Sequence, residues 1–190
     1  MELPDAAASP DGDLVKEVYA YFGLCMYFAQ VFETGLINVL TLLETAAAKP
    51  SSQTEHEAIF DSLYARHESL TFGNLLRALA KHGLIPFKLL EEARILKADR
   101  DHLAHRFFRD HDLDFATVGG CYSMIESLEV RRAKFSELDR RISAVVYRAY
   151  EASGQSSKLK RVMDKIEAEM LDEARDRSIV KAGNDEMSHR

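Results

Sequence analysis

The chain has 190 residues, of which 46% are hydrophobic and 29% are charged. This length is enough for one domain with a continuous apolar core, and the composition excludes an intrinsically disordered chain. The formal net charge of −6 gives no general attraction to nucleic acid or anionic membranes, so a polyanionic partner needs a local basic patch.

Its two cysteines, Cys25 and Cys121, have no neighbours at metal-ligand spacing. Such sparse cysteine use favours a reducing compartment, and we expect a cytoplasmic protein.

Apolar residues recur at three- and four-residue spacings along the chain, and almost no stretch alternates with a period of two. The pattern predicts an all-α fold, an up-and-down helical bundle that forms a single domain over residues 13–179. Residues 1–12 are acidic, contain two prolines and lack the apolar core of a signal peptide, so we expect a disordered leader. Residues 180–190 are expected to form a flexible tail.

The first helix is predicted from about Asp13 to about Ala48, with Asp13 as its N-cap and Lys49-Pro50 as its stop signal. It is unusually long and apolar, because no charged side chain occurs from Val18 to Phe32. A membrane span is therefore weighed against a helix buried in a bundle. The carboxylate of Glu33 favours the bundle, since a charge near the middle of a bilayer is costly. We expect no membrane association.

Three helices are predicted after a polar loop at residues 50–54. The first is short and runs over Glu55–His67, and the second is capped by Thr71 and ends at Gly83. The third starts near Phe87 and ends before Leu113. Its core side is predicted to consist of Leu89, Leu90, Ala93, Leu96, Leu103 and Phe107.

A long fifth helix is predicted to end near Ser153-Gly154, and Gly119-Gly120 either interrupts or precedes it. Residues from Ser157 to about Ile179 are predicted to form a charged, solvated final helix.

The best candidate for chemistry is Arg100-Asp101-His102-Leu103-Ala104-His105, in the second half of the fourth predicted helix. An imidazole such as that of His105 titrates near neutral pH and exchanges protons, and a guanidinium such as that of Arg100 binds phosphate. An arginine followed by a histidine after four to six residues occurs three times in the chain, about as often as chance predicts. Only Arg100 is followed by a polar residue, Asp101.

This pattern resembles the HEPN superfamily, whose helical bundles carry an arginine, commonly a polar residue after it, and a histidine four to six positions beyond the arginine. The resemblance extends to Ala29-Gln30-Val31-Phe32-Glu33 and to Leu103-Ala104-His105-Arg106-Phe107-Phe108. Many HEPN proteins are metal-independent endoribonucleases that act as toxins or in anti-phage defence, often as dimers with the site at the two-fold interface, and others have lost activity.

The resemblance implies a HEPN-like bundle with an endoribonuclease site at Arg100, Asp101 and His105, and no cofactor or metal. Its implied partners are a second copy of the chain, RNA and, for a toxin, a neutralising antitoxin protein. Gln30, Glu33 and His102 are the expected supporting residues.

Helix geometry gives an independent reason to expect a dimer. At about 100° per residue, Arg100 and His105 lie about 140° apart, so one regular helix does not aim both at one point. Arg100 falls on or beside the buried stripe, where an unpaired guanidinium is costly. We therefore expect Glu33, Asp101 or a second copy to meet it.

Two other interpretations of the segment are open. Arg100 and Asp101 can form structural ion pairs with His105 on a solvated face, which would indicate a non-catalytic interaction or regulatory protein that uses the apolar first helix as its contact surface. A metal centre is the other alternative, since Asp99, Asp101, His102 and His105 crowd one stretch.

The fifth predicted helix is locally positive and is a candidate RNA-binding surface. The alternative is a solvated face with internal salt bridges. Its candidate RNA-binding residues are Arg131, Arg132, Lys134, Arg140 and Arg141.

Overall fold

The computed structural model describes residues 5–152 and, beyond them, residues 154, 160, 161, 164 and 168. The described residues form six α-helices and one short 3₁₀ helix, with no strand among them, which confirms the all-α prediction. The chain divides into two compact units, residues 1–146 and 147–190, and the packing described below is that of the first. The predicted final helix and the predicted tail lie almost wholly outside the described residues.

Helix α1 spans Gly12–Ala48. Its N-cap is Asp11, whose carboxylate accepts hydrogen bonds from the backbone N–H of Asp13 at 3.1 Å and of Leu14 at 2.8 Å. The prediction of Asp13 as the cap is therefore wrong, because the extended residue that precedes the helix is Asp11. Lys49 ends the helix in the left-handed conformation, with φ of 52°.

By length and composition α1 is the one described helix that qualifies as a membrane span, but 44% of its most apolar window is buried by the rest of the protein. The core helix of a soluble protein can have the same length and apolar composition. The expectation of no membrane association stays a prediction.

Helix α2 spans Gln53–Glu68 and starts two residues before its predicted position, because Ser52 caps it. Helix α3 spans Phe72–His82. Thr71 caps its start and Gly83 its end, the latter with φ of 67°, a conformation that favours glycine. Both predicted boundaries of α3 are confirmed.

Helix α4 spans Phe87–His105 and is shorter than predicted. The helix breaks at Arg106, and the short helix α5, Phe107–Asp110, and the 3₁₀ helix η1, Asp114–Ala116, follow. The prediction of one helix to near Leu113 is wrong, because the break turns two phenylalanines onto Phe22 of α1. The ring centroids of Phe107 and Phe108 lie 5.5 and 4.7 Å from that of Phe22.

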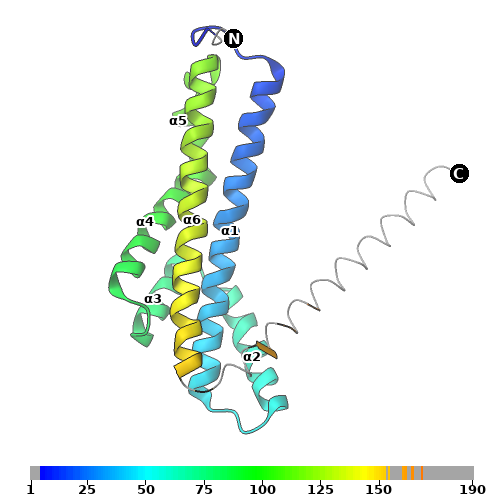
Figure 1. Ribbon diagram of the computed structural model, residues 1–190, viewed down its shortest axis with the longest axis vertical. Coiled ribbons are helices and arrows are strands. Elements are labelled where there is room, and N and C mark those ends of the chain that lie inside the picture. Colours follow the sequence, from blue (N-terminus) through cyan, green and yellow to red (C-terminus); the bar gives the residue numbers. More distant parts are fainter. Residues whose placement is uncertain (1–4, 153, 155–159, 162–163, 165–167, 169–190) are drawn as a thin grey trace, which may run out of the picture. The chain divides into compact units, whose positions relative to one another are not determined.

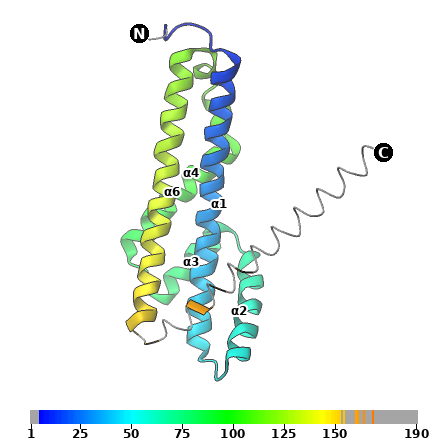
Figure 2. The same ribbon diagram turned by 45° about the vertical axis from the view of Figure 1, so that its right-hand side comes forward.

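The core side predicted for α4 is confirmed. All of its six apolar residues are buried, namely Leu89, Leu90, Ala93, Leu96, Leu103 and Phe107. Helix α1 is the central element, since α2, α3 and α4 all contact it. Helix α6, Val118–Ala152, runs beside α1 in both views (Figure 1, Figure 2). Phe32 of α1 and Phe135 of α6 pack there with ring centroids 6.1 Å apart.

Part of the predicted leader has defined contacts at the start of α6. The backbone N–H groups of Val118 and Gly119 donate to the carbonyl oxygens of Ala8 and Ala6, each at 2.9 Å. Gly119 and Gly120 lie in the first turn of α6 and do not interrupt it. A Cβ atom at position 120 would overlap with the backbone of Asp114, so this turn requires glycine.

Replacing Gly120 by alanine is expected to lower the free energy of unfolding by about 1–3 kcal/mol, because backbone cannot move aside as a side chain can. Gly23→Ala is the matched control in α1, since nothing lies within 4 Å of its new atom. Helix propensity should make that variant more stable by about 0.5–1 kcal/mol. Urea denaturation measures the change in the free energy of unfolding for both variants. An increase in that free energy for Gly120→Ala would contradict the placement of Asp114.

Candidate active site

Arg100 extends from α4 toward α1 and is held by two carboxylates. Its Nη2 donates to Glu33 Oε2 at 3.0 Å, and its Nη1 donates to Asp101 Oδ1 at 3.0 Å. This confirms the expectation that Glu33 or Asp101 meets the guanidinium. The Arg100 side chain is still 32% exposed, so these two contacts do not bury it completely.

Glu33 and Asp101 keep Arg100 protonated. Partial burial acts to lower its pKa, but the charge of Glu33 and the hydrogen bonds to Glu33 and Asp101 outweigh burial and raise the pKa above its ordinary value. The group is therefore a fixed positive charge with a defined orientation.

Asp101 lies between two cations, because it also forms an ion pair with Lys97 one turn earlier. The hydrogen bond from Lys97, followed by the Lys97 charge and Arg100, lowers the pKa of Asp101 against the opposing effect of burial. The carboxylate is thus ionised at neutral pH and only accepts hydrogen bonds. Its role is to orient Arg100, and it holds no proton to donate.

His105 is the last residue of α4, and its side chain is exposed. It lies four residues after Asp101 and so shares that face of the helix. Within the described part of the chain, no hydrogen bond or ion pair joins His105 to Arg100 or Asp101. The structure therefore places Arg100 against α1 and His105 toward solvent, and one chain does not bring the two together.

His102 has the defined interactions that His105 lacks. Its Nδ1 lies 3.3 Å from Arg131 Nη1, and its Nε2 lies 3.1 Å from Asp110 Oδ2. Because the guanidinium can only donate, Nδ1 accepts and Nε2 carries the proton that is donated to Asp110. The Phe107 ring packs edge-on against this imidazole. The Arg131 guanidinium lies over the Phe107 ring, with its central carbon 5.6 Å from the ring centroid.

Of the other expected supporting residues, Glu33 contacts Arg100 directly. Gln30 is exposed on α1, one turn before Glu33, and no hydrogen bond joins it to the other site residues in the described part.

The positive charge predicted for α6 is mostly compensated inside the protein. Arg132 pairs with Glu129 and Arg140 with Glu137, both at 2.8 Å, and Arg141 pairs with Glu92 at 2.5 Å. Arg131 donates to His102 Nδ1 at 3.3 Å, and Lys134 has no ion-pair partner among the described residues. Of the five candidate residues, only Arg131 and Lys134 therefore lack a carboxylate partner in the described part of the chain.

A metal centre at this segment is not supported. Among the described residues, no group of three or more histidine, cysteine, aspartate or glutamate side chains is arranged to hold a metal ion. Asp101 is occupied by Lys97 and Arg100, and His102 by Arg131 and Asp110.

Neither the protein-family models nor the known proteins and solved structures compared with the chain show a match. Function is therefore inferred from the residues of the site.

A second polar cluster, not singled out from the sequence, joins α1, α2 and α3. The imidazole of buried His67 contacts Thr41 Oγ1 at 3.0 Å and Glu44 Oε2 at 3.3 Å. Glu44 also pairs with Arg66, and lies 3.6 Å from His82 Nε2. Burial, against the charge of Glu44, lowers the pKa of His67, so the imidazole is neutral at pH 7 and serves packing.

Asp139 of α6 is also placed unexpectedly, because its carboxylate occupies the space over Gly35 of α1. No hydrogen bond or ion pair stabilises it among the described residues. Burial raises the pKa of Asp139 to about 6. A glycine in the middle of an apolar helix was the signal for this close approach of two helices.

Replacing Asp139 by asparagine is expected to stabilise the protein at pH 8 and not at pH 4. The folded-state pKa lies above the unfolded one, so the unfavourable ionisation sets in as pH rises from about 4 to about 6. Above that range the variant should gain about 1 kcal/mol, after allowance for solvent screening. Urea denaturation across pH measures the gain, with exposed Asp61→Asn as control, and a pH-independent difference would contradict the burial of Asp139.

Proposed function

We propose that the protein is a metal-independent endoribonuclease of the HEPN type, with Arg100 and His105 as catalytic residues and Asp101 as the residue that positions Arg100. The observation that supports it is the guanidinium of Arg100, which is held by Glu33 and by Asp101 at 3.0 Å each while 32% of its side chain stays exposed. A preorganised positive charge of this kind stabilises a phosphorane without reorganisation during the reaction.

In the proposed reaction His105 transfers protons and Arg100 supplies positive charge. His105 takes the proton of a ribose 2′-hydroxyl while that oxygen attacks the adjacent phosphorus, and the His105 imidazolium so formed gives the proton to the 5′-oxygen as the phosphorus–5′-oxygen bond breaks. Arg100 binds the phosphate oxygens and neutralises their charge, which is the role that a metal ion has in other nucleases. The products are a 2′,3′-cyclic phosphate and a 5′-hydroxyl end.

A second copy of the chain would complete the site, because Arg100 and His105 face different sides of α4. An uncharged apolar stripe on α1 supports such a dimer, since Leu24, Tyr27 and Val31 are 41%, 58% and 36% exposed at helical spacing. A cytoplasmic toxin or anti-phage role, and an antitoxin protein that neutralises it, belong to the same proposal.

The direct test is incubation of the protein with RNA in excess EDTA. We expect cleavage that leaves 2′,3′-cyclic phosphate ends and continues without divalent cations. A requirement for Mg²⁺, products with 3′-hydroxyl ends, or no turnover would contradict the proposal.

The alternative is a non-catalytic helical interaction protein, and one observation favours it. Two carboxylates compensate the Arg100 charge, as in a structural ion pair between helices, while the apolar stripe of α1 remains uncovered. Such a protein would bind a partner through α1 and show no RNA turnover, so the EDTA assay separates the two functions.

A further inference from the structure

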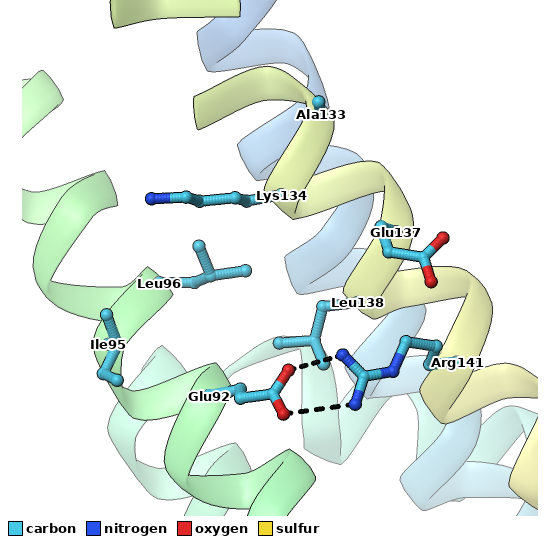
Figure 3. A pocket seen from close by; sticks show the side chains of 8 residues that line it. All are labelled: Glu92, Ile95, Leu96, Ala133, Lys134, Glu137, Leu138 and Arg141. Atoms are coloured by element: carbon cyan, nitrogen blue, oxygen red, sulfur yellow. Dashed lines mark hydrogen bonds and ion pairs between the residues drawn. The ribbon is translucent and has the colours of Figure 1, made fainter. Parts of the chain in front are cut away.

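A groove of about 500 Å³ lies between α4 and α6, and its lining includes none of Glu33, Lys97, Arg100 and Asp101. Its floor consists of aliphatic side chains, with Leu96 of α4 facing Leu138 of α6 and Ile95 beside them (Figure 3). Ile95 is 65% exposed, so its apolar surface is available to a molecule in the groove. This volume and lining are typical of sites that take small, mostly apolar molecules.

The charged residues around the groove are compensated, with one exception. Arg141 forms two hydrogen bonds with Glu92, at 2.5 and 3.1 Å, and closes one end of the groove (Figure 3). Glu137 is held by Arg140. At the other end Lys134 extends from α6 toward α4 (Figure 3), and no ion-pair partner meets its ammonium group in the described part of the chain. The groove thus offers an aliphatic floor and a single uncompensated positive charge.

We propose that this groove binds an aliphatic monocarboxylate, such as a medium-chain fatty acid. The carboxylate pairs with Lys134, and the chain lies over Ile95, Leu96 and Leu138 toward the Glu92–Arg141 pair. Lys134 and Arg141 are seven residues apart, which is two helical turns or about 10 Å. That distance suits a saturated chain of the octanoate to decanoate class. Among the described residues no aromatic side chain lines the groove, and an aliphatic lining of this kind suits a flexible chain.

The neighbouring hollow argues for a carboxylate over a phosphate. It has a volume of about 450 Å³, shares Lys134 with the groove, and is lined by Asp99 and Glu126 as well as Arg131. These two carboxylates line the hollow that Lys134 shares with the groove, and their negative charge opposes the binding of a bulky dianion there. A small monoanion that approaches from the apolar side gains the Lys134 charge and meets less of that repulsion.

Calorimetric titration of the full chain with decanoate below its micelle concentration tests the proposal. We expect saturable one-site binding that is several-fold tighter than for octanoate, because added methylene groups bury more apolar area. Lys134→Gln should weaken binding about tenfold, since it removes a charge-assisted bond. Ile95→Asn should weaken it similarly, and because Ile95 is exposed the protein should keep its helical circular dichroism.

The matched controls change one exposed lysine and one exposed large apolar residue outside the groove. Lys81→Gln on α3 and Phe87→Asn at the start of α4 should leave decanoate binding unchanged, as both side chains are exposed and neither lines the groove. Inorganic phosphate alone should not compete with decanoate. No saturable binding to the native protein, equal binding by Lys134→Gln, or displacement by phosphate would overturn the proposal.

Discussion

Replacing His105 by alanine is expected to lower the rate of RNA cleavage by about 100- to 10,000-fold, the contribution of a general acid or base. The free energy of unfolding should change by less than about 0.5 kcal/mol, because His105 is exposed and has no bond to lose among the described residues. The loss of activity would then be chemical and not structural. Rates are measured on a fluorescent RNA substrate in EDTA, and stability by urea denaturation.

His82→Ala is the matched control, because this histidine also follows an arginine by five residues but lies at the end of α3. Its rate should equal that of the native protein. Cleavage by His105→Ala at the native rate would remove His105 from the mechanism and leave Arg100 and Asp101 as structural residues.

Replacing Phe107 by alanine is expected to lower the free energy of unfolding by about 3–5 kcal/mol. Phe107 is 1% exposed and connects the break after α4 with the rest of the bundle. Its ring contacts Phe22, Phe108 and His111, and the Arg131 guanidinium lies over it. Removing it leaves a cavity and also frees the network around His102.

Phe87→Ala provides the comparison, because Phe87 is 72% exposed at the start of α4. A change within about 0.5 kcal/mol is expected there. A loss below 1 kcal/mol for Phe107→Ala in thermal or urea denaturation would show that the segment after α4 does not pack as described.

The features that local chemistry decides could be predicted from the sequence. Thr71 and Gly83 bound α3 as expected, because a capping hydroxyl and a left-handed glycine act within one turn. The partners of Arg100 could also be predicted, since an arginine beside the buried stripe of α4 needs a nearby carboxylate. Glu33 is the first acidic residue after the uncharged stretch from Val18 to Phe32 in the first helix.

The features that depend on tertiary contacts could not be predicted. Apolar periodicity continues through Phe107, so the pattern contains no sign of the break at Arg106, which the packing of Phe107 and Phe108 on Phe22 accounts for. That break brings Asp110 back to His102, which is why His102 and not His105 has defined partners.

The compensated charge of α6 depends on tertiary contacts only in part. Arg132 and Arg140 pair three residues back along their own helix, but Arg141 finds Glu92 of α4, a contact that only the packing of the two helices creates.

The proposed dimer site requires that Arg100 of one copy and His105 of a second copy act on the same phosphate. Two inactive variants, Arg100→Ala and His105→Ala, are mixed, unfolded and refolded together to test this requirement. The mixed dimer would contain one site with both residues intact, so we predict that cleavage in EDTA returns to about a quarter of the native rate from the statistics of a symmetric dimer. No recovery, although each variant refolds and forms mixed dimers, would contradict the claim.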